Sequence, residues 1–76
     1  MNTIEDRILK VVRKNMEKKM EFELTQTIKD IGIDSLGMII ILDALEDEFE
    51  IEIDKDEILI DGTIKDIIEY VKSKVN

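Results

Sequence analysis

Residues 32–49 read GIDSLGMIIILDALEDEF, and this stretch decides the fold of the chain. From Ser35 onward its apolar residues recur at helical spacing, and at 100° per residue they gather on one side of a helix. That side is made up of Met38, Ile41, Leu42, Leu45 and Phe49. We therefore expect a helix that begins at Ser35 and turns this face toward the core of a small domain.

Two further helices are predicted on either side of this one. Thr3 and Asp6 have the spacing of a capping box, and so do Thr63 and Asp66 in the second copy of the sequence TIKDI. The first copy of TIKDI, at residues 27–31, is expected to start a turn that Gly32 cuts short. The two helices should cover about residues 4–16 and 63–75, with Ile4, Ile8, Val11, Val12 and Met16 inward in the first and Ile64, Ile67, Ile68, Val71 and Val75 inward in the second.

The remaining segments are shorter. The sequence DEILI at residues 56–60 predicts one short helix, closed by the turn at Asp61 and Gly62. Residues 20–24 and 49–53 alternate between apolar and polar, which would suit a two-stranded sheet, but an isolated pair of strands is weak. We expect their apolar side chains to hold loops against the helices instead. The predicted fold is thus all-α, a single domain over residues 1–76 built as a four-helix bundle of three longer helices and one short one.

The composition excludes several classes of chemistry. The 76 residues contain no Cys, His or Pro, so disulfides and thiolate catalysis are ruled out, and a zinc site would need carboxylates alone. A domain this small has little room for an enzyme pocket of about 300 Å³ or more. No apolar run approaches the length that spans a membrane, and the N-terminus lacks the features of a signal peptide. We therefore expect a cytoplasmic monomer that is not an enzyme and holds no metal.

The net charge of −8 is unevenly distributed. Residues 1–20 hold six Lys or Arg against three Asp or Glu, whereas residues 21–62 hold two against fourteen. The acidic middle segment would repel nucleic acid and anionic membranes, and it would attract a protein with a basic patch. Solubility alone would explain the total charge but not its clustering.

Ser35 raises a chemical question, because the chain offers no base to activate its hydroxyl. A nucleophilic Ser needs His or Lys beside it, and the neighbouring carboxylate of Asp34 is too weak a base. Ser35 is a better candidate for modification by another enzyme, since the N-terminus of a helix favours a phosphate group. The simpler alternative is that Asp34 or Ser35 only caps the helix. If Asp34 is not the cap, it is a candidate for a metal or partner contact during modification.

The wider stretch from Leu24 to Phe49 resembles the acyl carrier protein family. The family pattern has Leu or Ile, then Gly-x-Asp-Ser-Leu, then an apolar helix ending in Leu-Glu-acid-acid-Phe. Residues 31–36 (IGIDSL) and 45–49 (LEDEF) match both parts at the right spacing. The resemblance implies that Ser35 carries 4′-phosphopantetheine, with Asp34 and Leu36 beside it in the cofactor-binding motif. A phosphopantetheinyl transferase would attach the group from coenzyme A, and its thiol would then hold an acyl group as a thioester.

On the same helical wheel, an apolar and acidic strip lies away from the core face. We expect it to dock partner enzymes that load or process the acyl group through basic patches, with apolar residues in shallow pockets and carboxylates pairing with Arg or Lys. The strip consists of Leu36, Ile39, Ile40, Asp43, Glu46 and Asp47. The acyl chain is expected to fold back between helices lined by Met38, Ile41, Leu42, Leu45 and Ile60.

The chain departs from the family pattern at four positions. Asp54 stands where a Pro commonly follows the second helix, and Gly37, Ile40 and Asp43 differ from the family's fatty-acid members. They usually have an acid where Gly37 stands, often Glu where Ile40 stands, and an apolar residue where Asp43 stands. These departures suggest a specialised carrier, in fatty acid or polyketide-type synthesis. Three alternatives stay open: a carrier of aminoacyl groups in peptide synthesis or cell-wall alanylation, a non-covalent acidic adaptor, and a weak cation site at residues 54–57.

Overall fold

The computed structural model describes residues 3–17, 19–57 and 62–75. Three α-helices account for most of this part of the chain: α1 (Ile4–Asn15), α2 (Ser35–Phe49) and α3 (Ile64–Val75). The described part of the connection between α2 and α3 contains one 3-10 turn, η1 (Lys55–Glu57). The all-helical class expected from the sequence is confirmed for the described residues, which contain no strand beyond one isolated bridge.

Each helix begins at the cap residue that its sequence provides. Thr3 Oγ1 accepts a 3.1 Å hydrogen bond from the Asp6 N–H at the start of α1. At the start of α3 the bonds are reciprocal, because Thr63 N–H donates to the Asp66 carboxylate at 3.0 Å and Asp66 N–H donates to Thr63 Oγ1 at 3.1 Å. These bonds satisfy backbone donors that a helix leaves without partners, which confirms both predicted caps.

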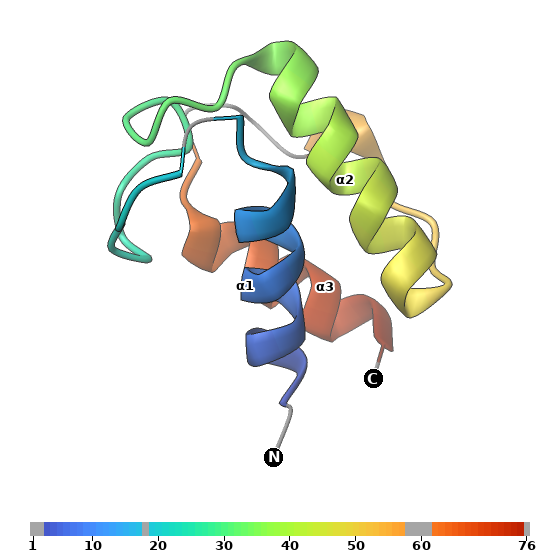
Figure 1. The fold of residues 1–76 in the computed structure, drawn as a ribbon. Coiled ribbons are helices and arrows are strands. Elements are labelled where there is room, and N and C mark those ends of the chain that lie inside the picture. The colour runs from blue at the N-terminus through green and yellow to red at the C-terminus, as the bar shows by residue number, and fades with distance from the viewer. Residues whose placement is uncertain (1–2, 18, 58–61, 76) are drawn as a thin grey trace.

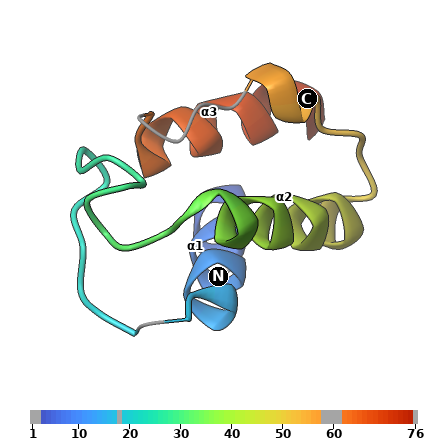
Figure 2. The same ribbon diagram turned by 90° about the horizontal axis from the view of Figure 1, so that it is seen from above.

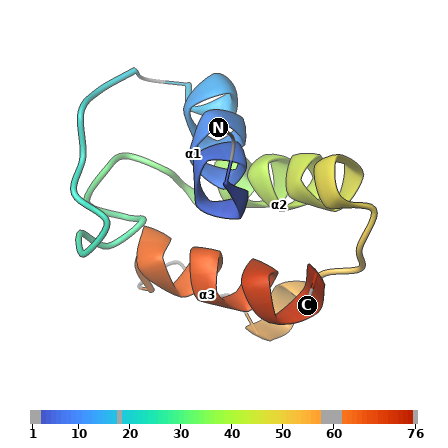
Figure 3. The same cartoon turned by 90° about the horizontal axis from the view of Figure 1, so that it is seen from below.

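The three helices pack around one core, with α1 crossing the other two (Figure 1). Seen from above and below, α2 and α3 run in the same general direction, and the long connection between α1 and α2 lies at one end of the molecule (Figures 2 and 3). Arg7 ties α1 to the last turn of α2, since its guanidinium donates to the Glu48 carboxylate at 3.0 Å and lies 4.4 Å from the centre of the Phe49 ring. The N-terminal end of α2 is left at the surface, next to the long connection.

The core consists of aliphatic side chains, and both helices and connections supply them. The inward faces predicted for all three helices are buried or partly buried. Each fully buried side chain of this size contributes about 1.5–3 kcal/mol of hydrophobic stabilisation. The connections add four buried residues that helical spacing does not identify: Ile28, Ile31, Ile33 and Ile53. The loops are therefore held in place by the core that they complete.

The two copies of TIKDI lie side by side. Thr27 and Thr63 form an isolated antiparallel bridge, and the Ile28 N–H donates to the Gly62 carbonyl at 2.8 Å. Asp30 N–H donates to Thr27 Oγ1 at 3.1 Å, which repeats the cap contact at the start of α3. The first copy ends in a turn at Gly32, whose φ of +84° interrupts the helical path, as expected.

The shorter segments agree only in part with what the sequence predicts. Residues 20–24 and 51–53 form loops, as expected, whereas Phe49 is the last residue of α2. Phe22, Leu24, Phe49, Ile51 and Ile53 pack on the core, but the prediction for Met20 was wrong because its side chain is exposed. The predicted short helix at residues 56–60 lies mostly outside the described residues, and only the single turn η1 is seen near its start. Ile60, expected to line an acyl site, lies outside them too. No described helix has the length and apolar character needed to cross a membrane.

Candidate functional site

Ser35 is the first residue of α2 and its side chain is exposed. Asp34 holds it in this position as the N-cap residue, with an extended backbone and its carboxylate turned toward the helix. Asp34 Oδ1 accepts a 2.7 Å hydrogen bond from the Gly37 N–H, and the Asp34 carbonyl accepts one of 2.9 Å from the Met38 N–H. The capping alternative is therefore confirmed for Asp34. The cap and the exposed hydroxyl share one turn, and the hydroxyl is open to an enzyme from outside.

The absence of a side chain at Gly37 fits this geometry. A Cβ at residue 37 would lie 3.2 Å from Asp34 Oδ1 and 3.4 Å from Ile33 Cγ2, both close contacts. The first turn of α2 also carries no acidic residue, whereas the first turns of α1 and α3 do. Beyond the Asp34 cap, no carboxylate in that first turn offsets the partial positive charge of the helix end. An anionic group attached at Ser35 would therefore meet backbone donors as well as one nearby carboxylate.

A groove of about 270 Å³ adjoins Ser35. Its walls include Leu36, Ile40 and Ile41 from α2, Met16 at the end of α1, and Ile31 from the connection. The residues on either side of Ser35 thus border a hollow between α1, α2 and the loop that precedes α2. Its lining is mainly apolar but also includes Asn15, Glu17 and Asp34. Helical periodicity does not reveal this groove, because the packing of the 31–34 segment creates it.

The groove differs from the acyl site expected from the sequence. Of the described residues expected to line that site, only Ile41 borders the groove. Met38, Leu42 and Leu45 are buried in the core, each no more than 5% exposed. Any occupant of the core between these three side chains would have to push them apart.

Three large apolar side chains of α2 stand in solvent. Leu36 is 67% exposed, Ile39 44% and Ile40 47%, and the only comparable described residue is Met20. The acidic side chains of the strip begin one turn further along: Asp43 and Asp47 are exposed, and Glu46 is partly buried. The strip predicted from the helical wheel is therefore at the surface, continuous from the turn that holds Ser35.

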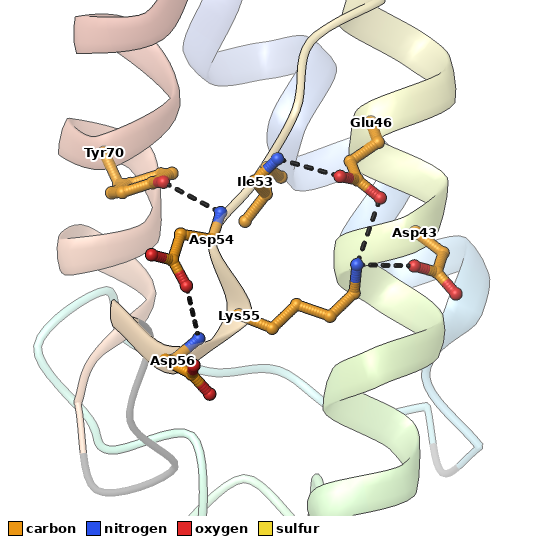
Figure 4. Close-up of polar contacts among 7 residues, drawn as sticks. All are labelled: Asp43, Glu46, Ile53, Asp54, Lys55, Asp56 and Tyr70. Carbon is orange, nitrogen blue, oxygen red and sulfur yellow. Dashed lines mark hydrogen bonds and ion pairs between the residues drawn. The ribbon is translucent and has the colours of Figure 1, made fainter.

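Sequence reasoning missed a contact that this strip makes within the chain (Figure 4). Lys55 Nζ lies 3.0 Å from Asp43 Oδ1 and 3.1 Å from Glu46 Oε1, so one ammonium group bridges two carboxylates. Glu46 Oε2 accepts a 2.8 Å hydrogen bond from the Ile53 N–H. The hydrogen bonds to Asp43 and then Glu46 raise the pKa of Lys55 above its ordinary value of 10.5. One feature of the sequence could have indicated this ion pair. Asp43 is acidic at a position where fatty-acid members of the similar family have an apolar residue.

The cation site considered for residues 54–57 receives no support from the geometry. Asp54 Oδ1 accepts a 3.0 Å hydrogen bond from the Asp56 N–H, which is a local turn contact. Within the described ranges, no three acidic side chains gather in an arrangement suited to a metal ion.

Two comparisons with known proteins, by family profile and by sequence identity, agree on the family of this chain. The family profile described as "Phosphopantetheine attachment site" matches residues 6–71, which is most of the chain. Proteins named "Acyl carrier protein" from Buchnera aphidicola subsp. Acyrthosiphon pisum, strains 5A, Tuc7 and APS, are each 36% identical over 76 residues. These alignments cover 97% of this chain and 95% of each relative. No solved structure shows a significant match.

Proposed function

The chain belongs to the acyl carrier protein family, whose members carry 4′-phosphopantetheine covalently, and from this premise we propose that Ser35 is the residue that bears the group. The observation that carries this proposal is the exposed position of Ser35 at the capped first turn of α2. Its hydroxyl needs no base within the chain, because a phosphopantetheinyl transferase would supply the catalysis. Asp34 shapes the turn, and Leu36 borders the groove beside it.

Loaded in this way, the protein is a carrier and not a catalyst. The cofactor supplies the thiol that the chain lacks, and an acyl group bound to it as a thioester is presented to other enzymes. We propose fatty acid or polyketide-type synthesis as the pathway, in line with the names of the relatives. The apolar groove next to Ser35 supports a carrier of acyl rather than aminoacyl groups, since its α2 wall is aliphatic.

We also propose that the exposed strip on α2 docks the transferase and the enzymes that load and process the acyl group. Exposed apolar side chains such as Leu36 and Ile40 can fill shallow pockets, while acidic neighbours steer the approach of a basic surface. Asp47 is the acid best suited to an outside partner, because it is exposed and no ion pair to it is found among the described residues. Asp43 and Glu46 already share Lys55.

Intact mass measurement tests the attachment site. The natural chain and Ser35→Ala are incubated with coenzyme A and a promiscuous phosphopantetheinyl transferase. We expect the natural chain to gain the mass of one phosphopantetheine group and Ser35→Ala to gain none. Modification of both chains would place the group on another residue, and modification of neither would leave the non-covalent adaptor as the better proposal.

The docking strip is tested by the rate of the same reaction. Ile40→Asp and Asp47→Lys should each slow modification at low protein concentration, while Met20→Asp, a matched exposed position outside the strip, should leave the rate unchanged. Urea unfolding of each variant checks that the fold is retained. Equal rates for all variants would remove the strip as the docking surface.

Three broader expectations remain predictions. The short fourth helix is proposed for residues 56–60, and nuclear magnetic resonance would test it. A monomeric state would be checked by sedimentation equilibrium. A cytoplasmic location would be checked by cell fractionation.

A further inference from the structure

The ammonium group of Lys55 pairs with Asp43 and Glu46, two of the acidic residues that we propose bind partner enzymes. We propose that Lys55 is an internal competitor for Asp43 and Glu46, which a partner's arginine displaces, and that this displacement loosens residues 51–55 from α2. This inference rests on the proposed docking role of the strip and adds a conformational consequence to it. Residues 51–55 are called the clamp segment below.

The clamp segment is attached to the helices at five points. The first is the bond from the Ile51 N–H to the Glu46 carbonyl at 3.2 Å, and Figure 4 shows the polar contacts of the residues that follow. The Ile53 side chain is buried, and the Ile53 N–H donates to Glu46 Oε2 at 2.8 Å. The next N–H, that of Asp54, donates to the Tyr70 hydroxyl on α3 at 3.0 Å. Lys55 then reaches back to Asp43 and Glu46 on α2. The segment thus connects α2 to α3, and two of its five attachments depend on the carboxylate of Glu46.

The ion pairs of Lys55 are open to exchange. The Lys55 side chain is 37% exposed and that of Asp43 is 59% exposed, so solvent and a partner both reach the bridge. Ion pairs at such a surface are weak and are screened by salt. A guanidinium binds a carboxylate through two parallel hydrogen bonds, which a lysine ammonium cannot do. An arginine on a partner's basic surface is therefore a better ligand for these acids than Lys55.

Replacement of Lys55 by a partner's arginine at Glu46 would affect the buried residue Ile53 through one hydrogen bond, which joins the Ile53 N–H to Glu46 Oε2. Glu46 Oε1 is held by Lys55 and Oε2 by the Ile53 N–H, so both oxygens are in use. An arginine that binds Glu46 through both oxygens competes with Lys55 and with the Ile53 N–H, because each of them uses one of the same two oxygens. The clamp segment then keeps the bond from the Ile51 N–H to the Glu46 carbonyl, the packed side chains of Ile51 and Ile53 and the contact with Tyr70. Docking on the outer face of α2 is in this way linked to opening between α2 and α3.

The test compares Lys55→Met with Lys65→Met, which removes the same charge from an exposed lysine of α3 with no ion pair among the described residues. Lys55→Met should speed modification of Ser35 by a promiscuous phosphopantetheinyl transferase by about twofold or more at low salt, since charge steering controls the on-rate. Lys65→Met should have a smaller effect. Lys55→Arg should slow the reaction, because arginine would hold both carboxylates more firmly.

Amide hydrogen exchange tests the coupling. The Ser35→Ala chain is used, so that the transferase binds without reacting. Binding should reduce the protection of the Ile53 amide severalfold, and Lys55→Met should reduce it without a partner, while amides within α1 keep their protection.

The outcomes separate this inference from the proposed function. If the natural chain is never modified, the attachment proposal fails first. If Ser35 is modified but Lys55→Met reacts no faster than Lys65→Met, or the Ile53 amide keeps its protection when the transferase binds, the competition by Lys55 is excluded. A slower reaction of Lys55→Met would make Lys55 part of the docking surface itself and would also overturn the proposal.

Discussion

The backbone N–H of Gly37 donates a 2.7 Å hydrogen bond to Asp34 Oδ1, and this bond closes the first turn of α2 around Ser35. The two residues depend on each other, because a side chain at residue 37 would approach the same oxygen to 3.2 Å. The turn that presents the proposed attachment site is therefore stabilised by the Asp34 carboxylate, and the lack of a Cβ at Gly37 leaves room for that carboxylate.

Removal of the cap should weaken α2 at the site. Asp34→Ala should lower the free energy of unfolding by about 1 kcal/mol, while Asp34→Asn, which can accept the same hydrogen bond, should lose much less. Urea denaturation measures both values. We also expect Asp34→Ala to slow modification of Ser35, because the turn that holds it frays. Equal free energies of unfolding for Asp34→Ala and Asp34→Asn would mean that the hydrogen bond of the cap contributes little to stability.

A double-mutant cycle tests the fit between Gly37 and the cap. Alanine has a higher helix propensity than glycine by up to about 1 kcal/mol. In the natural background the new Cβ would crowd Asp34 Oδ1, so Gly37→Ala should yield less than this gain. In the Asp34→Ala background the oxygen is gone and the gain should be larger. The coupling is read from four urea unfolding curves, and strictly additive effects would show that the close contact carries no cost.

Two residues with positive φ should respond in opposite directions to substitution. Gly32 has a φ of +84° with no atom within 4 Å of an added Cβ, so Gly32→Ala should cost about 1–2 kcal/mol from backbone strain alone. Glu50, the C-cap of α2, has a φ of 54°, so Glu50→Gly should stabilise the protein by up to about 1 kcal/mol.

The matched control for the C-cap is Glu50→Gln, which removes the charge but keeps the strained backbone. Chemical unfolding of the natural chain, Glu50→Gly and Glu50→Gln separates strain from charge. Stabilisation by Glu50→Gln as large as that by Glu50→Gly would assign the effect to charge repulsion at the helix end instead.

The bridge of Lys55 predicts a dependence of stability on pH. The pKa of Lys55 is raised in the folded state by Asp43 and then Glu46, so the folded protein binds this proton more tightly than the unfolded chain does. The stabilisation is fully present below the ordinary lysine pKa of 10.5 and is lost as pH rises through the higher folded value.

The difference in unfolding free energy between the natural chain and Lys55→Met should therefore shrink on going from neutral to strongly alkaline pH. Other lysines and Tyr70 titrate in both proteins, so the difference isolates the bridge. Lys65→Met serves as the control, and its difference from the natural chain should vary less with pH. A constant difference for Lys55→Met would show that the bridge does not stabilise the fold.

Much of the fold and the central site residue follow from local patterns in the sequence. Helical spacing of apolar residues predicted α1, α2 and α3, and the Thr-x-x-Asp spacing predicted where α1 and α3 begin. These features depend on residues three or four positions apart, which lie on adjacent turns of one helix. The motif around Ser35 is also contiguous, so it is visible before any folding is considered.

Tertiary structure decided the contacts between residues far apart in the chain. The groove beside Ser35 exists because the 31–34 connection packs near the end of α1, and the bridge of Lys55 exists because residues 51–55 turn back along α2. No periodic pattern encodes either contact, since each joins segments whose relative positions are set by the shared core. The sequence alone thus determined which helix begins with the hydroxyl that we propose is modified. Packing determined which acids beside it are already paired and which remain open to a partner, because ion pairing depends on distances in space that sequence spacing does not specify.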